Sequence, residues 1–285
     1  MPSALRALLA LAVAVGLDLR WGEPPARLHP VVWMGRLIAF LERGAPRGEA
    51  GRLCYGAGMV VAAVLGVSLP ALLLEALLRR LGLLGAVLLG LSLKPCFAIR
   101  ELLQATRRVA AALERDDLVA TRQGLRSLVS RDTSALPPPL LAAAAIESLT
   151  ENSSDSVVAP LFYFALWGFP GAVAYRMINT LDAMVGYRDE RYEHLGKAAA
   201  WLDDAANLIP SRLTALALTL AAPLVGGSPG ATWRILRRDR RLTASPNAGW
   251  PMAAGAGALG LTLEKVGHYR LNPTGRPPGT ADVGR

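Results

Sequence analysis

Acidic residues recur at every fourth position in one stretch of the chain, at Glu147, Glu151 and Asp155. If this stretch is helical, the three carboxylates project from one face, where like charges at that spacing repel one another. A divalent cation would remove the repulsion, and Mg²⁺ suits carboxylates that share it with a few waters. Asn152 lies in the same turn and adds an amide. The spacing therefore indicates a metal site, with a solvated acidic helix face, or a helix cap at Asp155, as the alternative.

A second cluster consists of Asp203, Asp204 and Asn207, in the sequence Trp-Leu-Asp-Asp-Ala-Ala-Asn. On a helix, Asp203 and Asn207 lie one turn apart. Asn179 and Asp182 precede them within an otherwise apolar stretch. Such acids suit metal–phosphate binding or proton transfer. The alternative is that the Asp-Asp pair only marks the solvated end of a helix.

Cations are interleaved with these acids, and nine of the 22 acidic residues lie between positions 147 and 204. Arginine recognises phosphate and carboxylate through paired hydrogen bonds, although some of these cations will only pair with neighbouring acids. A segment that mixes both signs beside apolar runs favours a polyanionic substrate with a metal ion. Nucleic acid is a poor match, because aromatic content is 6% and the acids would repel phosphate. The interleaved cations are Arg176, Arg188, Arg191, Lys197 and Arg212.

Two turns carry further polar candidates. His29 follows a Gly-Glu-Pro-Pro turn and precedes Pro30, a position from which it would act as a general base or donate to an anion. The alternative is a histidine that caps the turn. Asn247 lies in Ser-Pro-Asn-Ala-Gly, which is a loop by composition, where it would contact a ligand or simply make the turn.

The elements that must position these residues are apolar helices. Of the 285 residues, 52% are apolar and 19% charged, against about 25% charged in soluble domains. The net charge of +9 suits anionic lipid or an anionic substrate. We therefore expect an all-α, polytopic integral membrane protein with about four or five transmembrane helices and polar helical loops, in the cell (inner) membrane. The candidate spans are the charge-free runs 53–74, 156–175 and 213–233 and the shorter runs 7–17 and 81–93.

The rest of the chain reads as helices and turns within one membrane-embedded domain over residues 1–285. We read run 7–17 as an uncleaved first helix, because no small-residue cleavage site precedes Asp18. We also expect an amphipathic helix over 99–130, a new helix near Leu140, and a loop followed by a short helix over 242–263. The proline-containing tail 272–285 is expected to be loose. Two cysteines exclude a disulfide scaffold, and no phosphate-binding P-loop, dinucleotide fingerprint or serine elbow is present.

Several of these motifs, in this order, resemble the adenosylcobinamide-phosphate synthase family, also called CbiB or CobD. The resemblance runs from Asp18 to about Gly275. Glu23 stands where the family more often has aspartate, and Ser156 where it usually has glycine. The matching segments are Asp18-Leu-Arg-Trp-Gly-Glu-Pro with His29-Pro-Val, Glu147-Ser-Leu-Thr-Glu-Asn with Ser154-Asp155, Tyr175-Arg-Met-Ile-Asn-Thr-Leu-Asp182, Leu202-Asp-Asp-Ala-Ala-Asn207 with Pro210-Ser-Arg212, and Ser245-Pro-Asn-Ala-Gly249.

The resemblance implies attachment of (R)-1-aminopropan-2-ol, or its O-phosphate, to the f-side-chain propionate of adenosylcobyric acid. It implies ATP as co-substrate, Mg²⁺, a corrinoid substrate and a lipid bilayer, and it leaves a homo-oligomer open. The expected catalytic residues are Glu151, Asp182, Asp203, Asp204 and His29. The expected metal ligands are Glu147, Glu151, Asp155 and Asp203. The expected substrate-binding residues are Glu23, Asn152, Arg176, Asn179, Lys197, Asn207, Arg212 and Asn247.

Two other classes of function compete with an enzyme. A transporter of a corrinoid or another large anion would also place acids and arginines at membrane depth. It predicts paired repeats and helices broken at the midplane, and the sequence shows no repeat. A non-catalytic membrane anchor explains the hydrophobicity but not the clustered acids, amides and arginines.

Overall fold

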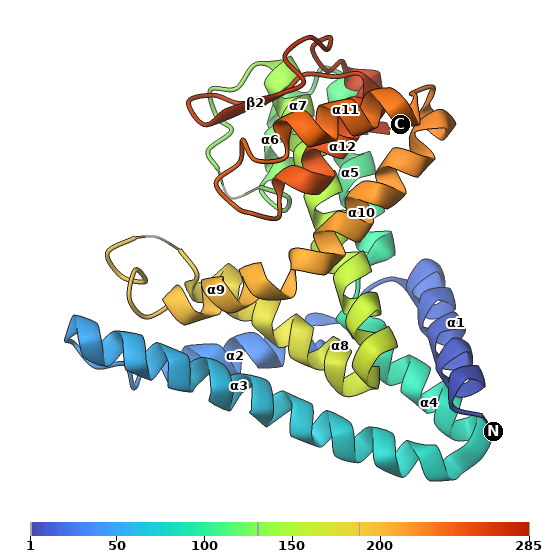
Figure 1. Cartoon of the computed structure of the whole chain (residues 1–285), viewed down its shortest axis with the longest axis vertical. Helices are drawn as coiled ribbons and strands as arrows, with labels where there is room; N and C mark the ends of the chain where they lie inside the picture. The colour runs from blue at the N-terminus through green and yellow to red at the C-terminus, as the bar shows by residue number, and fades with distance from the viewer. Residues whose placement is uncertain (1, 130, 188, 285) are drawn as a thin grey trace. The chain divides into compact units, whose positions relative to one another are not determined.

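The computed structural model describes residues 2–129, 131–187 and 189–284, which form two compact helical units. The first unit comprises Met1–Arg100 and Ala159–Asn207, and the second comprises Glu101–Val158 and Leu208–Arg285. Contacts among the described residues cluster into these two units, and the single membrane-embedded domain over residues 1–285 stays a prediction. Each unit is described by itself below (Figure 1).

The first unit is built from apolar helices. Its core joins Ala10, Ala14, Leu89 and Leu93, among others, into one cluster. The helices are α1 (Ser3–Trp21), α2 (Pro30–Glu42), α3 (Glu49–Leu78), α4 (Gly82–Leu93), α8 (Ala159–Val185) and α9 (Lys197–Ala206). Short 3-10 turns occupy Ala26–Leu28, Arg79–Leu81 and Lys94–Cys96.

Two pairs of helices organise this unit, α1 with α4 and α3 with α8 (Figure 1). The first pair packs closely because α4 has Gly90 at the contact, where a Cβ would lie 2.6 Å from the Ala10 carbonyl oxygen. In the second pair, α8 is interrupted at Gly168, whose φ is +70°, and Pro170 follows. The buried Glu75 carboxylate of α3 accepts a hydrogen bond from the Phe169 N–H at 2.9 Å. The neighbouring helix therefore supplies an acceptor for a backbone amide at the interruption of α8.

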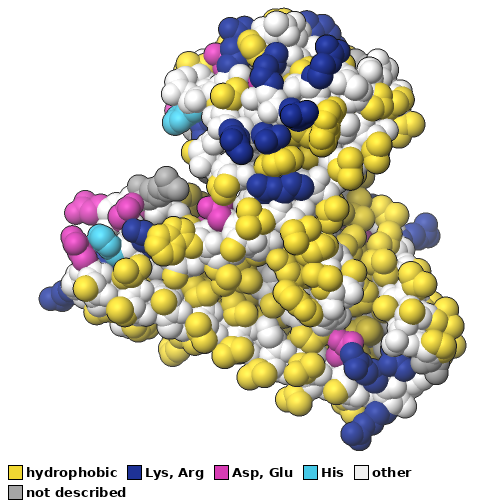
Figure 2. Space-filling view, viewed as in Figure 1, with side chains coloured by type: hydrophobic (Ala, Val, Ile, Leu, Met, Phe, Trp, Pro, Cys, Tyr) yellow, Lys and Arg dark blue, Asp and Glu magenta, His cyan; other side chains and the backbone are white. Residues whose placement is uncertain are grey.

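Exposed apolar side chains cover much of the face of the first unit seen in Figure 2. On α3, for example, Leu69, Leu72 and Leu73 are exposed. Such surfaces are typical of contact with lipid. Three helical segments are long and apolar enough to cross a membrane: Glu49–Glu114, Pro138–Val185 and Leu208–Val225. The all-α, membrane-type fold is therefore confirmed, while the number of spans stays a prediction.

The second unit packs small helices around α12. Helix α12 is rich in glycine and alanine and nearly every residue in it is buried. Thr150 of α7 and Thr232 of α11 lie against Gly255 and Gly257 of α12, so glycine is what lets these helices approach. The elements are α5 (Ile99–Glu114), α6 (Leu118–Leu125), α7 (Pro138–Ser153), a π-helical turn (Ser154–Val158), α10 (Leu208–Ala221), α11 (Pro229–Asp239), α12 (Gly249–Leu259), β1 (Leu263–Lys265) and β2 (Tyr269–Leu271).

Four expectations from the sequence need correction in this unit. The helix expected over 99–130 is two helices, because α5 ends at Glu114, Asp116 adopts a φ of 53° and α6 begins at Leu118. Run 213–233 is not one span, because α10 ends at Ala221, Gly226 adopts a φ of 80° and α11 begins at Pro229. The antiparallel hairpin of β1 and β2, with Leu263 opposite Leu271, had no signal in the sequence analysis. The tail is packed: Val283 is buried, and Arg276 pairs with Asp282 at 2.5 Å. The expected helix near Leu140 and the loop and helix over 242–263 are confirmed.

Candidate functional site

Helices α8 and α9 of the first unit bring five predicted site residues together. Asn207 donates from Nδ2 to Asp203 Oδ2 at 3.0 Å, one helical turn away, as the spacing predicted. Asn179 of α8 donates to the other oxygen, Asp203 Oδ1, at 3.5 Å. Asp182 lies one turn beyond Asn179 and acts electrostatically on Asp203, as does Asp204. We call Asn179, Asp182, Asp203, Asp204 and Asn207 the carboxylate cluster.

The electrostatics of the carboxylate cluster set Asp203 apart from an ordinary surface acid. Burial, together with the neighbouring charge of Asp182, raises the pKa of Asp203 to about 7, although the hydrogen bonds from Asn207 and Asn179 lower it. Among the described residues, the donors that hydrogen-bond to the Asp203 carboxylate are the neutral amides of Asn179 and Asn207. A carboxyl group that exchanges its proton near neutral pH is suited to acid–base chemistry or to binding a cation.

Tyr175 supports this cluster and was not singled out from the sequence. Its hydroxyl donates to Asn207 Oδ1 at 2.9 Å, so the amide nitrogen of Asn207 faces Asp203. The ring of Tyr175 stacks on Tyr163 at 5.3 Å between centroids. The signal was available, because positions 175, 179 and 182 recur at helical spacing and lie on one face of α8.

The start of α9 is fixed against the end of α8. Gly196 approaches the Val185 carbonyl oxygen so closely that a Cβ at this position would collide with it. Lys197, expected to bind phosphate, places its ammonium 5.3 Å from the centroid of the Trp201 ring. This close contact fixes the start of α9 against the end of α8, and it thereby positions Asp203 opposite Asn179.

A second group of charges in the first unit joins α1 to the segment after α4. Lys94 lies 3.1 Å from Glu23 Oε1 and 3.5 Å from Asp18 Oδ1, and the side chains of Lys94 and Asp18 are almost fully buried. Asp18 Oδ2 accepts the N–H groups of Ile99 and Arg100 at the start of α5. We call Asp18, Glu23, His29 and Lys94 the N-terminal network. Lys94 and Asp18 were not predicted as members, because nothing in local spacing joins residues so far apart.

His29 caps the start of α2, as the alternative interpretation of its position predicted. Its Nδ1 accepts the Val31 N–H at 3.2 Å at the start of α2, so the ring proton resides on Nε2, which lies 2.5 Å from Glu23 Oε2. Burial opposes ionisation of Glu23, but His29 and Lys94 outweigh it and lower the pKa of that carboxyl. Glu23 is therefore held as a carboxylate by positive and hydrogen-bonding neighbours.

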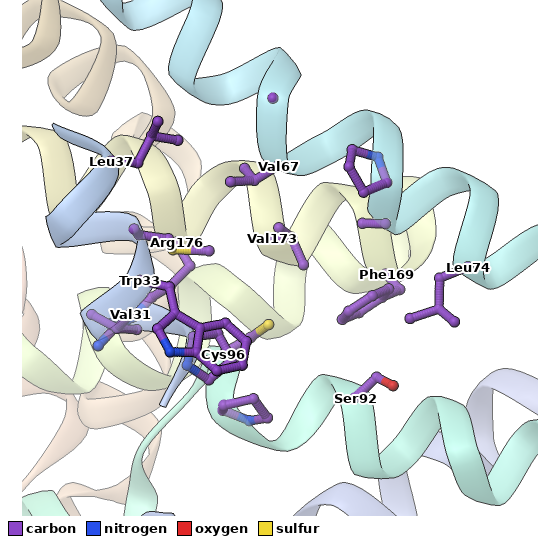
Figure 3. Close-up of a pocket in the computed structure, with 16 residues that line it drawn as sticks. Val31, Trp33, Leu37, Val67, Leu74, Ser92, Cys96, Phe169, Val173 and Arg176 are labelled. Carbon is purple, nitrogen blue, oxygen red and sulfur yellow. The ribbon is translucent and has the colours of Figure 1, made fainter. Parts of the chain in front are cut away.

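An apolar cavity of about 360 Å³ lies beside this network (Figure 3). Helix α2 supplies Trp33, α3 supplies Val67 and Leu74, and α8 supplies Phe169. Arg176 is the cation that lines this cavity, and its buried Nε has no hydrogen-bond partner among the described residues. A second cavity, of about 710 Å³, shares several of these walls and is lined by Glu23 and Lys94. Volumes of this order accommodate drug-sized ligands.

In the second unit, Glu147 and Glu151 of α7 line a small polar pocket of about 140 Å³ with Arg131, Lys265 and Tyr269. Glu147 pairs with Arg131 at 2.7 Å. Burial and the charge of Glu147 raise the pKa of Tyr269 well above its usual value. Asp155 does not line this pocket, because it lies in the π-helical turn, where the spacing of α7 changes. Sequence reasoning missed Arg131, Lys265 and Tyr269.

The remaining predicted residues of the second unit serve local contacts. Asn152 donates to the Ser148 carbonyl and hydroxyl oxygens within α7. Arg212 donates to Asn247 Oδ1 at 2.5 Å, which joins α10 to the loop before α12. The guanidinium of Arg212 also lies 4.6 Å from the centroid of the Trp250 ring, and that of Arg240 lies 4.7 Å from it. Arg240 had not been predicted.

A metal ion has few places to bind. Across residues 2–129, 131–187 and 189–284, no three His, Cys, Asp or Glu side chains gather closely enough to hold one. Glu147 fits a metal poorly, because Arg131 already balances its charge. The carboxylate cluster fits Mg²⁺ better, since Mg²⁺ needs only one or two carboxylates when substrate phosphates and waters complete its shell.

Comparisons with known proteins show which family the chain resembles. The family described as "CobD/Cbib protein" matches residues 11–283. "Cobalamin biosynthesis protein CobD" of Dehalococcoides mccartyi is 45% identical, over 95% of this chain and 88% of the relative. The proteins of the same name from Geobacter metallireducens (45%, over 93% and 83%) and Rhodobacter capsulatus (42%, over 96% and 90%) are similar. No solved structure matches significantly. The match over nearly the whole length shows that the chain belongs to the CobD/CbiB family.

Proposed function

We propose that this protein joins an amine, (R)-1-aminopropan-2-ol or its O-phosphate, to the propionate of a corrinoid acid through an amide bond driven by ATP. Its relatives carry the name of cobalamin biosynthesis proteins, and the chain takes part in cobalamin biosynthesis as a member of their family. The ligase chemistry, the amine and ATP are the parts that we propose.

The reaction has two chemical steps. The γ-phosphoryl group of ATP passes to a propionate oxygen, which gives ADP and an acyl phosphate. The amine nitrogen then attacks the carbonyl carbon, the bond from that carbon to the phosphate oxygen breaks, and inorganic phosphate leaves. Because the amine is protonated at neutral pH, a base must first remove a proton from it.

The carboxylate cluster is the observation that carries the proposal. Asp182 of α8 and Asp204 of α9 act electrostatically on Asp203, and amides from Asn179 and Asn207 fix the orientation of Asp203. Asp182 and Asp203 would hold the Mg²⁺ of ATP, which neutralises charge on the phosphates during transfer. Asp204 belongs to the same cluster and is our candidate for the base that accepts the proton of the amine.

The cavities of the first unit support a large amphipathic substrate. Their walls are apolar, with Trp33 and Phe169 shared between them, and the cations Arg176 and Lys94 line them. A corrinoid acid offers a broad apolar ring and anionic side chains, so apolar walls with a few cations suit it. Arg176 is the residue that we propose for contact with its carboxylate.

The test is a mass-spectrometric assay with the purified full-length protein in lipid. Adenosylcobyric acid, the amine or its phosphate, and MgATP are supplied, with each component omitted in turn. A mass increase that corresponds to one amide and depends on ATP and amine is expected. If folded protein in lipid gives no product under any combination, the ligase proposal is wrong and the transport of a large anion becomes the better explanation.

A further inference from the structure

Helix α10 of the second unit carries a line of large apolar side chains on its exposed side. Ile209, Leu213, Leu216 and Leu220 recur every three or four residues, so they lie along one side of the helix. Leu224 extends this line into the 3-10 turn Ala222–Val225, and all five side chains are exposed. We call these five residues the leucine stripe.

The buried side of α10 is less apolar than the leucine stripe. It consists of small and hydroxyl-bearing residues, namely Pro210, Ser211, Thr214, Ala215 and Thr219. The hydroxyls of Thr214 and Thr219 donate to carbonyl oxygens one turn earlier in the helix. A surface helix of a water-soluble protein has the opposite arrangement, with its apolar side buried. Small and hydroxyl residues between helices are typical of helices in lipid, so the leucine stripe is suited to contact with acyl chains.

The chain becomes strongly basic directly after the leucine stripe. A short turn leads into α11, and residues 234–241 contain five arginines and one acid, Asp239. Asp239 is buried, pairs with Arg238 at 2.6 Å and accepts a hydrogen bond from the Asn272 N–H. It is also the one acidic residue between positions 205 and 263. The segment therefore has a large excess of positive charge.

Three exposed arginines of this segment have no ion pair with any residue that the structure describes: Arg234, Arg237 and Arg241. Arg234 and Arg237 lie one turn apart on α11, and Arg241 follows one turn later. We call these three residues the arginine face. Figure 2 shows Lys and Arg side chains gathered on the visible face of the second unit, with apolar side chains among them. Like charges at this spacing repel one another, so the arginine face favours an anionic partner.

Trp233 lies between the leucine stripe and the arginine face in the sequence and is 44% exposed. Tryptophan is enriched where a membrane meets water, because its ring is apolar and its N–H is polar. Apolar stripe, tryptophan and arginines thus follow one another in the order of acyl chains, interface and headgroups. A soluble anion would contact the arginines and leave the leucine stripe uncovered, whereas a lipid contacts both.

We propose that the leucine stripe and the arginine face together form a docking surface for anionic phospholipids. The stripe contacts the acyl chains, the three guanidinium groups donate to the headgroup phosphates, and Trp233 lies at the boundary. A zwitterionic headgroup carries an ammonium group that the arginines repel, so the surface selects lipids with a net negative charge. No residue of the carboxylate cluster takes part, so the proposal is independent of the ligase.

The test measures which lipid lies beside Trp233. The full-length protein is reconstituted in vesicles of equal amounts of phosphatidylglycerol and phosphatidylcholine, with brominated acyl chains on one lipid or the other, because bromine quenches tryptophan fluorescence on contact. The contribution of Trp233 is the difference between the wild type and Trp233→Phe. We expect phosphatidylglycerol to be enriched about tenfold or more beside Trp233. High salt should reduce this enrichment, because it screens exposed charges.

Charge-removing variants identify the arginines responsible. Arg234→Gln, Arg237→Gln and Arg241→Gln should each lower the preference for phosphatidylglycerol by about two- to fivefold. Their side chains are exposed, so all three variants are expected to fold. Arg270→Gln is the matched control, because it removes the same charge from an exposed position of β2. Glu264 lies 3.7 Å from Arg270, so this variant should leave the preference unchanged.

A tryptophan introduced into α10 tests the leucine stripe. Leu216→Trp in the Trp233→Phe background should restore quenching by brominated lipid, because position 216 is exposed within the stripe. If neither lipid quenches it in folded protein, the stripe contacts protein, such as a second copy of this chain, and the proposal is wrong. Equal quenching of Trp233 by the two lipids would show lipid contact without selection of the headgroup, which also overturns the proposal. If Arg270→Gln lowers the preference as much as the other variants, the net charge of the protein explains it and the arginine face does not.

Discussion

The first unit holds its buried acids in two opposite ways. In the N-terminal network, Lys94 and His29 surround Glu23 and lower its pKa. In the carboxylate cluster, Asp203 has amide partners and acidic neighbours, and burial raises its pKa to about 7. Acids whose charge is balanced by built-in cations stabilise a fold. A carboxyl group whose pKa is raised toward neutral pH, such as that of Asp203, is able to exchange protons or bind metal, and we assign chemistry to its cluster.

The largest effect should come from removing the charge of Asp203. Asp203→Asn keeps the size of the side chain and an acceptor for Asn207, so the fold should persist, while amide formation falls by about 10²–10⁴-fold. The rate of product formation by mass spectrometry measures this. Glu190→Gln, in the exposed segment between α8 and α9, serves as the control and should keep full activity. Wild-type turnover by Asp203→Asn would remove the cluster from the mechanism.

Breaking the N-terminal network should instead cost stability. Lys94→Met leaves Asp18 and Glu23 buried without their cation, a loss typically of about 3–5 kcal/mol. Denaturant unfolding in detergent measures it, and Arg108→Gln, whose ion pair with Glu101 is exposed on both sides, should change little. If Lys94→Met unfolds like the wild type but makes no product, Lys94 belongs to the chemistry and the contrast between the two groups is wrong.

The next largest effect should be on the pH dependence of stability, to which Asp203 of the carboxylate cluster contributes. Because the pKa of Asp203 is raised in the folded state, the folded protein retains a proton that the unfolded chain loses between pH 4 and about 7. Asp203 therefore makes stability fall as pH rises through this window. The Tm of Asp203→Asn should exceed that of the wild type by several degrees at pH 8 and match it more closely at pH 5. An equal difference at both pH values would contradict the buried, protonated carboxyl.

The smallest effect should come from His29. Asparagine at this position still caps α2, so His29→Asn loses only the contact with Glu23, whereas His29→Ala loses the cap as well, which typically costs about 1 kcal/mol more. Unfolding curves of the two variants measure the difference. Both should retain turnover; loss of activity in His29→Asn at unchanged stability would make His29 a base.

The sequence predicts contacts between residues that are close in the chain better than contacts between residues that are far apart in it. The pair of Asp203 and Asn207 follows from one helical turn, and the place of α9 beside α8 brings in Asn179. Lys94 meets Asp18, and Arg131 meets Glu147, only through tertiary packing that no local spacing encodes. Run 213–233 is a different kind of error: its continuous hydropathy predicted one helix, although Gly226 and Pro229 form a turn within it.

The interruption of α8 has a consequence for assembly in the membrane. The Phe169 amide finds its acceptor on Glu75, 94 residues earlier in the chain. Where water is absent, an amide without an acceptor is costly, so the break in α8 is stabilised by the presence of α3 beside it. The part of α8 after the break carries Asn179 and Asp182. Because α3 precedes α8 in the chain, the carboxylate of Glu75 is synthesised before the Phe169 amide that it binds. A contact outside the carboxylate cluster therefore stabilises the helix that carries two of its residues.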